Sequence, residues 1–269
     1  MNNTFDFNRF SLLMKRQWVE NKKLFLMASF GIMGILIVIN SLIMKWETGF
    51  YDPGYRFSIF LLSLFLGGSV FANYVFKDLS DKNSSTSFLL VPASHFEKSL
   101  TGIFYTFIVF PIVFLTLFYV IDFCFVSICN NIGENLMITK GYRTPKNVQL
   151  YNFIMNNKNI REILGKFIGF WLIIQAFVLA GTVLFEGRSY IKTAATGFAL
   201  LFLIGFLVYL SNELFLDDII LQFQHKVYSQ ELIKPTEQLL NSILEITLIY
   251  VLPPILLVIA YFKLKEKQV

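Results

Sequence analysis

The sequence predicts an all-α polytopic membrane protein with six transmembrane helices, and three observations support that prediction. Six stretches of about 17 to 21 residues are almost free of charge, and ~20 apolar residues in a helix cross a ~30 Å hydrocarbon core. The chain is 55% hydrophobic and only 15% charged, whereas soluble domains carry roughly 25% charged residues. It also holds 31 Phe among 269 residues, more rings than a soluble core of that size could bury.

The six stretches are expected to form a single transmembrane domain over residues 24–269. The first stretch follows 23 residues that include many charges, so it is expected to be a retained anchor rather than a cleaved signal. Six spans place both termini on one side, and basic residues gather in the amino-terminal segment, the short loops and the tail. That bias favours the cytoplasm for both termini. The expected spans are about 24–44, 57–76, 100–121, 167–185, 193–210 and 246–262.

Residues 1–23 are expected to contain a cytoplasmic amphipathic helix. Phe7, Phe10, Met14 and Trp18 recur at steps of three and four residues, so they share one helical face. Such a helix lies flat on the membrane surface with its aromatic face in the interface. It is either a topological anchor alone or also a surface for a cytoplasmic partner.

The loop between the second and third spans is the most structured of the expected cytoplasmic loops. An apolar run at 88–91 precedes Pro92, and Ser94 is placed to cap a helix whose third residue is Glu97, as in a capping box. An apolar turn beside a new helix suits a docking surface, although an interfacial loop also needs apolar residues. The candidate partner-coupling residues are Phe10, Met14, Trp18, Phe88, Leu89, Leu90, Pro92 and Glu97.

Features further along the chain predict kinks and outer segments. Pro111 interrupts the third span and is expected to kink it. The outer segment 123–162 is polar and lacks strong periodicity, although 150–164 could form a helix that leads to the fourth span. Residues 211–242 are expected to form one or two short helices at the outer leaflet, and a proline pair is expected to bend the sixth span.

A few polar residues join the fourth and fifth spans, which predicts a tight cytoplasmic helical hairpin. Small side chains near the turn would let the two backbones approach closely. These small residues are Gly181, Thr182, Ala194, Ala195 and Gly197.

Several sequence motifs that are typical of enzymes are absent from this sequence. It contains no G-x-x-x-x-G-K-[ST], so no nucleotide is bound through a P-loop, and His95 and His225 lie in separate loops, which excludes H-E-x-x-H. Cys124 and Cys129 are five residues apart and are interpreted as core residues rather than a disulfide or metal site. No enzyme activity, cofactor or metal is expected. The net charge of +5 is attributed to topology, because no basic stripe interleaved with aromatics indicates nucleic-acid binding.

Polar residues within the spans are few, and they are costly in lipid. Asp122 and Glu245 are expected near the outer ends, where water reaches them. An ion-coupled transporter usually places carboxylates near the midplane of the membrane. This pattern therefore argues against transport driven by an ion gradient through this chain and indicates another source of energy. The other polar residues within spans are Asn40, Asn73 and Gln175.

Three local segments carry a resemblance to a known family: Phe7-Asn8-Arg9-Phe10…Lys15-Arg16…Trp18-Val19-Glu20-Asn21-Lys22-Lys23, Phe88-Leu89-Leu90-Val91-Pro92-Ala93-Ser94…Glu97-Lys98, and Phe185…Ile191-Lys192-Thr193. With the six-span arrangement, they resemble the membrane subunits of type-2 ABC exporters in the versions found in Bacteroidetes bacteria. The resemblance implies a permease in the bacterial cytoplasmic (inner) membrane that pairs with a similar or identical subunit.

The same resemblance implies two cytoplasmic ABC ATPase subunits, received by residues 5–23 and 84–98. The substrate path would lie between the two permease subunits, lined by the first, second and fifth spans. Lipids, glycolipids, peptides or drugs are the typical substrates of such exporters. The alternative is a membrane protein that does not transport, such as a scaffold, a sensor or an immunity protein.

Overall fold

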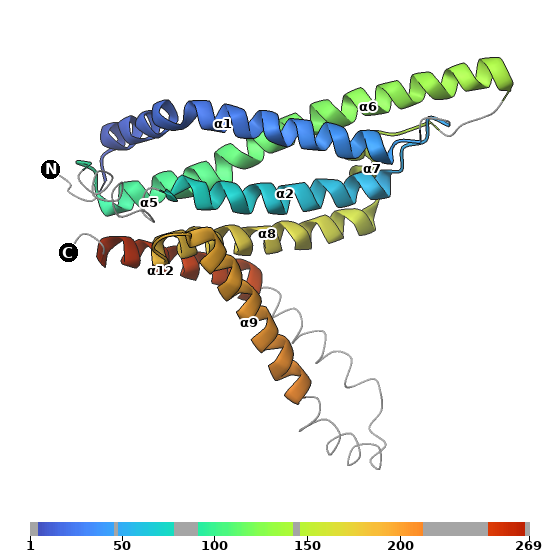
Figure 1. Cartoon of the computed structure of the whole chain (residues 1–269). Helices are drawn as coiled ribbons and strands as arrows, with labels where there is room; N and C mark the ends of the chain where they lie inside the picture. The colour runs from blue at the N-terminus through green and yellow to red at the C-terminus, as the bar shows by residue number, and fades with distance from the viewer. Residues whose placement is uncertain (1–4, 46–47, 78–90, 142–145, 212–246, 267–269) are drawn as a thin grey trace, which may run out of the picture.

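A computed structural model describes residues 5–45, 48–77, 91–141, 146–211 and 247–266 of the chain. The described residues are helical almost throughout, apart from short connections and an isolated β-bridge between Lys45 and Phe50. Figure 1 shows most of the helices running side by side along one direction, with the start of the first helix and the end of the last one at the same end of the molecule.

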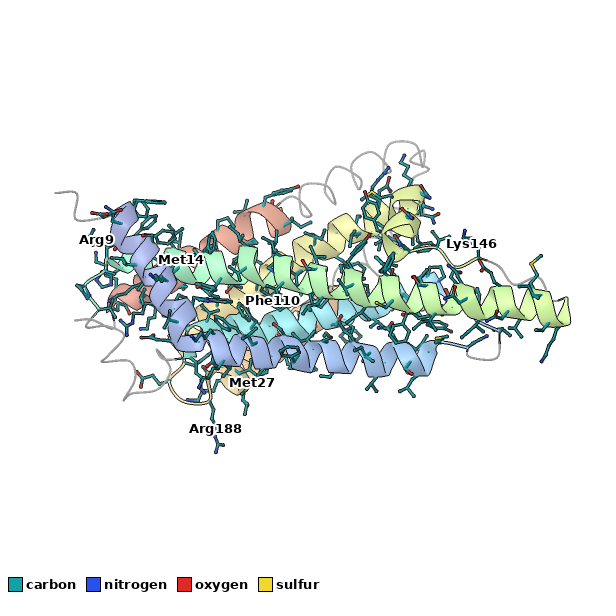
Figure 2. All side chains as sticks on the ribbon, turned by 90° about the horizontal axis from the view of Figure 1, so that it is seen from above. Arg9, Met14, Met27, Phe110, Lys146 and Arg188 are labelled. Atoms are coloured by element: carbon teal, nitrogen blue, oxygen red, sulfur yellow. The ribbon has the colours of Figure 1, made fainter. Side chains whose placement is uncertain are left out.

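Helix α1 (Phe7–Ile43) combines the expected surface helix and the expected first span in 37 continuous residues. Asp6 caps it, because its carboxylate accepts a hydrogen bond of 2.8 Å from the backbone N–H of Asn8. No proline or glycine occurs between Phe7 and Gly31, so nothing in the sequence stops the helix near residue 23. Figure 2 shows that the first turns, near Arg9 and Met14, run at an angle to the rest of the helix.

Helix α2 (Pro53–Val75) returns alongside α1, and the third crossing consists of α5 (His95–Phe104), the π-helical segment η1 (Tyr105–Val109) and α6 (Phe110–Lys140). Aromatic rings fill the contact between α2 and α6. The ring centroid of Phe60 lies 5.8 Å from that of Phe114 and 5.0 Å from that of Phe118. The π-helical segment ends at Val109, two residues before the proline that was predicted to kink this span, and π-helical turns mark places where a helix departs from regular geometry.

The third crossing is far longer than expected. From His95 to Lys140 it covers 46 residues, or roughly 69 Å at ~1.5 Å per residue, so it extends well past a ~30 Å hydrocarbon core. The segment after residue 122, which lacks strong periodicity, continues the same helix as far as Lys140. Helix α6 ends at Gly141, whose φ of 70° is the left-handed geometry of a helix C-cap. The buried stripe that supports the extension, Asp122, Val126, Cys129 and Gly133, has helical spacing but mixed chemistry, so hydrophobic periodicity did not reveal it.

The possible helix at 150–164 is present but divided. Helix α7 (Leu150–Asn156) ends at Asn156, and a single residue, Asn157, separates it from α8 (Lys158–Leu184). Helix α8 is central to the fold, because it packs against α2, α9 and α12. It therefore connects the helices of the first half of the chain with those of the second half.

The tight hairpin between α8 and α9 (Ser189–Ser211) confirms the prediction from small residues. A Cβ added to Gly181 would overlap the side chain of Thr193, and one added to Gly197 would lie 3.2 Å from the Phe177 ring. Beyond this contact, α9 leaves the bundle (Figure 1), and its side chains from Phe198 to Leu207 are exposed wherever they are described.

Five helical stretches in the described part of the chain are long and apolar enough to cross a membrane, and each contains or overlaps one of the first five expected spans. The sixth expected span begins at Ile246, outside the described residues, and continues as the π-helical segment η3 (Thr247–Val251) and helix α12 (Leu252–Glu266). The proline pair occupies the second and third positions of α12, one residue after the π-helical segment η3. The five stretches are Phe7–Ile43, Pro53–Val75, His95–Lys140, Lys158–Leu184 and Ser189–Leu207.

Candidate functional site

A buried carboxylate, Glu97, joins the start of α1 to the start of α5. Its Oε1 accepts a hydrogen bond of 2.7 Å from the backbone N–H of Asp6 and lies 3.1 Å from the Arg9 guanidinium. Its Oε2 accepts a bond of 2.8 Å from the backbone N–H of Ser94, and the Ser94 hydroxyl accepts one of 3.1 Å from the backbone N–H of Glu97. This pair is the expected capping box. We call Asp6, Arg9, Ser94 and Glu97 the amino-terminal cluster.

Aromatic contacts extend the amino-terminal cluster to α12. The Phe5 ring lies 5.8 Å from Phe10 and 6.1 Å from Phe96, and Phe96 lies 6.5 Å from Tyr261 of α12. Two segments that sequence reasoning had related only through the family resemblance are therefore in direct contact, and the last helix contributes to the same end of the molecule. A further bond of 2.9 Å from the Tyr105 hydroxyl to the carbonyl of Met14 fixes α1 against the third crossing.

The structure gives the candidate coupling residues different surroundings. Trp18 and Pro92 are exposed, whereas Phe10 and Met14 are half-buried, because α1 turns Leu13 toward the bundle at this point. Glu97 is fully buried, so it positions the surface instead of forming part of it. The remaining candidates, Phe88, Leu89 and Leu90, lie outside the described residues.

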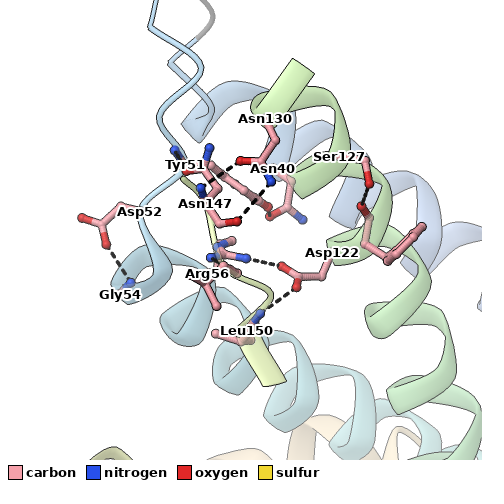
Figure 3. A network of polar contacts seen from close by, with 12 residues as sticks. Asn40, Tyr51, Asp52, Gly54, Arg56, Asp122, Ser127, Asn130, Asn147 and Leu150 are labelled. Carbon is pink, nitrogen blue, oxygen red and sulfur yellow. Dashed lines mark hydrogen bonds and ion pairs between the residues drawn. The ribbon is translucent and has the colours of Figure 1, made fainter. Parts of the chain in front are cut away.

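A second polar cluster lies at the opposite end of the bundle, and Figure 3 shows it. Arg56, in the first turns of α2, is fully buried, and its Nη1 lies 2.7 Å from Oδ1 of Asp122 on α6. The Arg56 Nη2 donates a bond of 2.6 Å to the carbonyl of Val148, and the other oxygen of Asp122 accepts one of 2.9 Å from the backbone N–H of Leu150. The guanidinium also lies 4.6 Å from the centre of the Tyr51 ring, a cation–π contact.

Asn147 completes this second cluster by bonding to two neighbouring segments. Its side-chain oxygen accepts a bond of 2.9 Å from the backbone N–H of Tyr51, and its side-chain nitrogen donates one of 2.7 Å to the carbonyl of Gly49. The Asn130 side chain on α6 bonds both the N–H and the carbonyl of Asn147, at 2.8 and 3.1 Å. Burial raises the pKa of the Tyr51 hydroxyl, which stays protonated and donates to Asn40.

The expectation that water reaches Asp122 was wrong, because residues 147–150 and Arg56 cover it. Sequence reasoning did not single out Arg56. The signal that it missed is a basic residue directly beside an apolar run, opposite an acidic residue at the same end of the next span. An unpaired charge at that depth is costly, so such residues are expected to pair.

A third polar contact lies in the middle of the bundle. The buried amide of Gln175 on α8 fits between α2 and Trp171 when its nitrogen donates to the carbonyl of Gly68 and its oxygen accepts from the Trp171 indole N–H, both at 2.9 Å. Nearer the hairpin, Asn73 accepts a bond of 2.9 Å from the hydroxyl of Ser189. These residues are uncharged, and their hydrogen bonds join neighbouring helices. Glu245 lies outside the described residues.

Among the described residues, no three His, Cys, Asp or Glu side chains gather in a way that could hold a metal ion. No model of a known protein family matches the chain, and neither a curated protein nor a solved structure does. The class of protein therefore follows from the fold. The long apolar helices, with many hydrophobic side chains facing outward and the charges of Arg56 and Asp122 paired inside, define a multi-pass helical membrane protein.

Proposed function

We propose that this chain is the membrane-spanning permease subunit of an ABC exporter, energised by a separate cytoplasmic ATPase subunit. The observation that carries the proposal is the amino-terminal cluster. Glu97 holds the beginning of α1 against the chain that enters α5, so the two segments that would receive an ATPase form one surface. A partner that pushes on one of them also moves the other.

The helix that leaves this surface suits the transmission of movement. From His95 the third crossing continues through 46 residues to the opposite end of the bundle, interrupted only by the π-helical segment η1. A displacement at the amino-terminal cluster would reach the far end along this single helix. In this proposal, the end of the molecule where α1 starts and α12 ends faces the bacterial cytoplasm.

The substrate would be a lipid, a peptide or a drug-like molecule. Helices α1 and α9 turn many apolar side chains outward, including Phe30, Ile35, Phe198 and Phe202. A second permease subunit, identical or similar to this one, would cover part of these faces and leave a path for an amphiphilic substrate between the two subunits. The path would be lined by α1, α2 and α9.

The experiment that tests the proposal is gentle purification of the tagged full-length chain in nanodiscs, with identification of the proteins that accompany it. An ATP-binding subunit in near-equal amount is the expected result. A chain that is purified alone, or with a partner that does not hydrolyse ATP, would replace the exporter proposal with a scaffold, sensor or immunity role.

A set of variants makes the same experiment specific for the docking surface. Replacing Phe88, Leu89 and Leu90 by Asp should release the ATPase, because charges would then interrupt an apolar contact. The matched control replaces Met137 and Ile138 by Asp, since these two exposed apolar residues lie near the far end of α6. If the ATPase stays bound to the triple variant, docking by this loop is wrong.

A further inference from the structure

Residues 147–150, which we call the strap, lie across the end of the bundle opposite the amino-terminal cluster. The strap leads into α7, of which Leu150 is the first residue. Three side chains from two helices hold the strap: Arg56 from α2, and Asp122 and Asn130 from α6, just over two turns apart. Figure 3 shows the strap between these side chains and the Tyr51 segment. The strap is therefore fastened mainly through polar contacts with groups far away in the sequence.

The apolar attachment of the strap and α7 is small. Of the seven residues of α7, Leu150 and Ile154 are the buried ones. Their neighbours Tyr151 and Met155 are exposed. Hydrophobic burial therefore provides Leu150 and Ile154, with the half-buried Phe153 packed against the same cluster. The polar contacts of Arg56, Asp122 and Asn130 supply the rest.

The polar contacts are arranged so that they form or break together. One carboxylate oxygen of Asp122 accepts a hydrogen bond from Arg56, and the other accepts one from the N–H of Leu150. The second terminal nitrogen of Arg56 donates to the carbonyl of Val148. If the strap moves slightly, two buried charged groups each lose a partner without gaining water, which is strongly unfavourable. Intermediate positions are therefore penalised, and the stable arrangements are fully closed or fully open to water.

We propose that the strap is a two-state clasp over this end of the bundle, and that the Arg56–Asp122 pair sets the balance between its states. The closed state is the one in the structure. In the open state the strap lifts together with α7, and water takes the place of the strap backbone at Arg56 and Asp122. The clasp does not depend on the exporter proposal, because its test uses this chain alone.

Cys129 is a native reporter for the open state. Its side chain is fully buried in the hydrophobic cluster that also contains Leu150 and Ile154, so it is reachable only when that region opens. Cys124 is exposed, so its interpretation as a core residue was wrong, and it would be replaced by Ser. The measurement is the rate at which a maleimide labels Cys129 in the full-length chain in nanodiscs, together with the thermal midpoint of each variant.

The most informative variant is Leu150→Pro, with Leu150→Ala as its control. Leu150 is the first residue of α7, a position that tolerates proline, and Gln149 already has the extended ψ of 146° that precedes proline. Proline removes the N–H that Asp122 binds, whereas alanine removes the same side chain and keeps the N–H. We expect labelling to be at least about tenfold faster in the proline variant than in the alanine variant, at similar thermal midpoints.

A second pair of variants keeps the strap unchanged. Asp122→Asn removes the charge at the centre of the clasp, and Glu134→Gln removes an exposed charge on the same helix. We expect faster labelling for Asp122→Asn only. Equal labelling rates within both pairs would overturn the proposal. In the proline–alanine pair, a faster rate accompanied by a matching drop in the thermal midpoint would also overturn it, because Cys129 would then be exposed by general unfolding.

Discussion

Replacing Glu97 by Ala should detach the start of α1 from the loop before α5 while the membrane helices stay folded. The carboxylate accepts hydrogen bonds from two backbone N–H groups, at 2.7 and 2.8 Å. A hydrogen bond to a charged group contributes about 1.5 to 3 kcal/mol. The Arg9 side chain is 38% exposed, so its pairing with Glu97 adds at most about 1 kcal/mol. The sum predicts that local opening becomes easier by about 3 to 7 kcal/mol, or at least a hundredfold.

Hydrogen–deuterium exchange of the full-length chain in nanodiscs measures this opening directly. In the Glu97→Ala variant, peptides from the first turns of α1 and from residues 91–98 should exchange at least a hundredfold faster. Peptides from α2 should not change. Glu20→Ala is the matched control, because Glu20 forms an exposed pair of 2.6 Å with Arg16 on the same helix, and such pairs contribute little. Unchanged exchange in Glu97→Ala, or an equal change in Glu20→Ala, would refute the reasoning.

Three further predictions follow from other contacts. Gly181→Ala should destabilise the α8–α9 hairpin by about 1 to 3 kcal/mol, because the new methyl group overlaps α9. Gly165→Ala is the control, because it adds a methyl group in open space on the same helix and should be neutral or stabilising. Thermal denaturation compares the two variants. Arg56→Met and Asp122→Asn should each lower the free energy of unfolding by about 3 to 5 kcal/mol, because each leaves a buried partner unpaired. The double variant should lower it by clearly less than the sum of the two, and a double-mutant cycle measures this difference. A cysteine at the exposed position of Arg188 should be protected from impermeant reagents added outside intact cells, and labelling there would contradict the proposed orientation.

Local sequence signals predicted the helices well where one chemical property persists along the chain. The apolar runs identified five crossings that the structure contains, and the Ser94–Glu97 spacing identified a capping box that it also contains. Close packing of the α8–α9 hairpin followed from small residues such as Gly181. In each case the relevant partners lie within a few turns of one another or in consecutive helices, so a short window of sequence holds the information.

The same signals failed where a helix is stabilised by mixed chemistry. The extension of α6 beyond Asp122 buries a carboxylate, a thiol and a glycine on one side, and this pattern resembles a polar loop when only hydrophobicity is considered. The break at Asn157 between α7 and α8 was missed for a related reason, because α7 is fixed by Leu150 and Ile154 through contacts with other segments.

The sequence by itself determined that this protein crosses a membrane several times as helices. That property depends on about 20 consecutive apolar residues and on the cost of unpaired backbone groups in lipid, and both can be read from any one segment alone. Only the tertiary structure decided which charges are buried and what they hold. Asp122 meets an arginine 66 positions away, and Glu97 meets a backbone N–H 91 positions away. The energy of a buried charge depends on its partners in space, so the clasp and the amino-terminal cluster exist only once the helices have packed together.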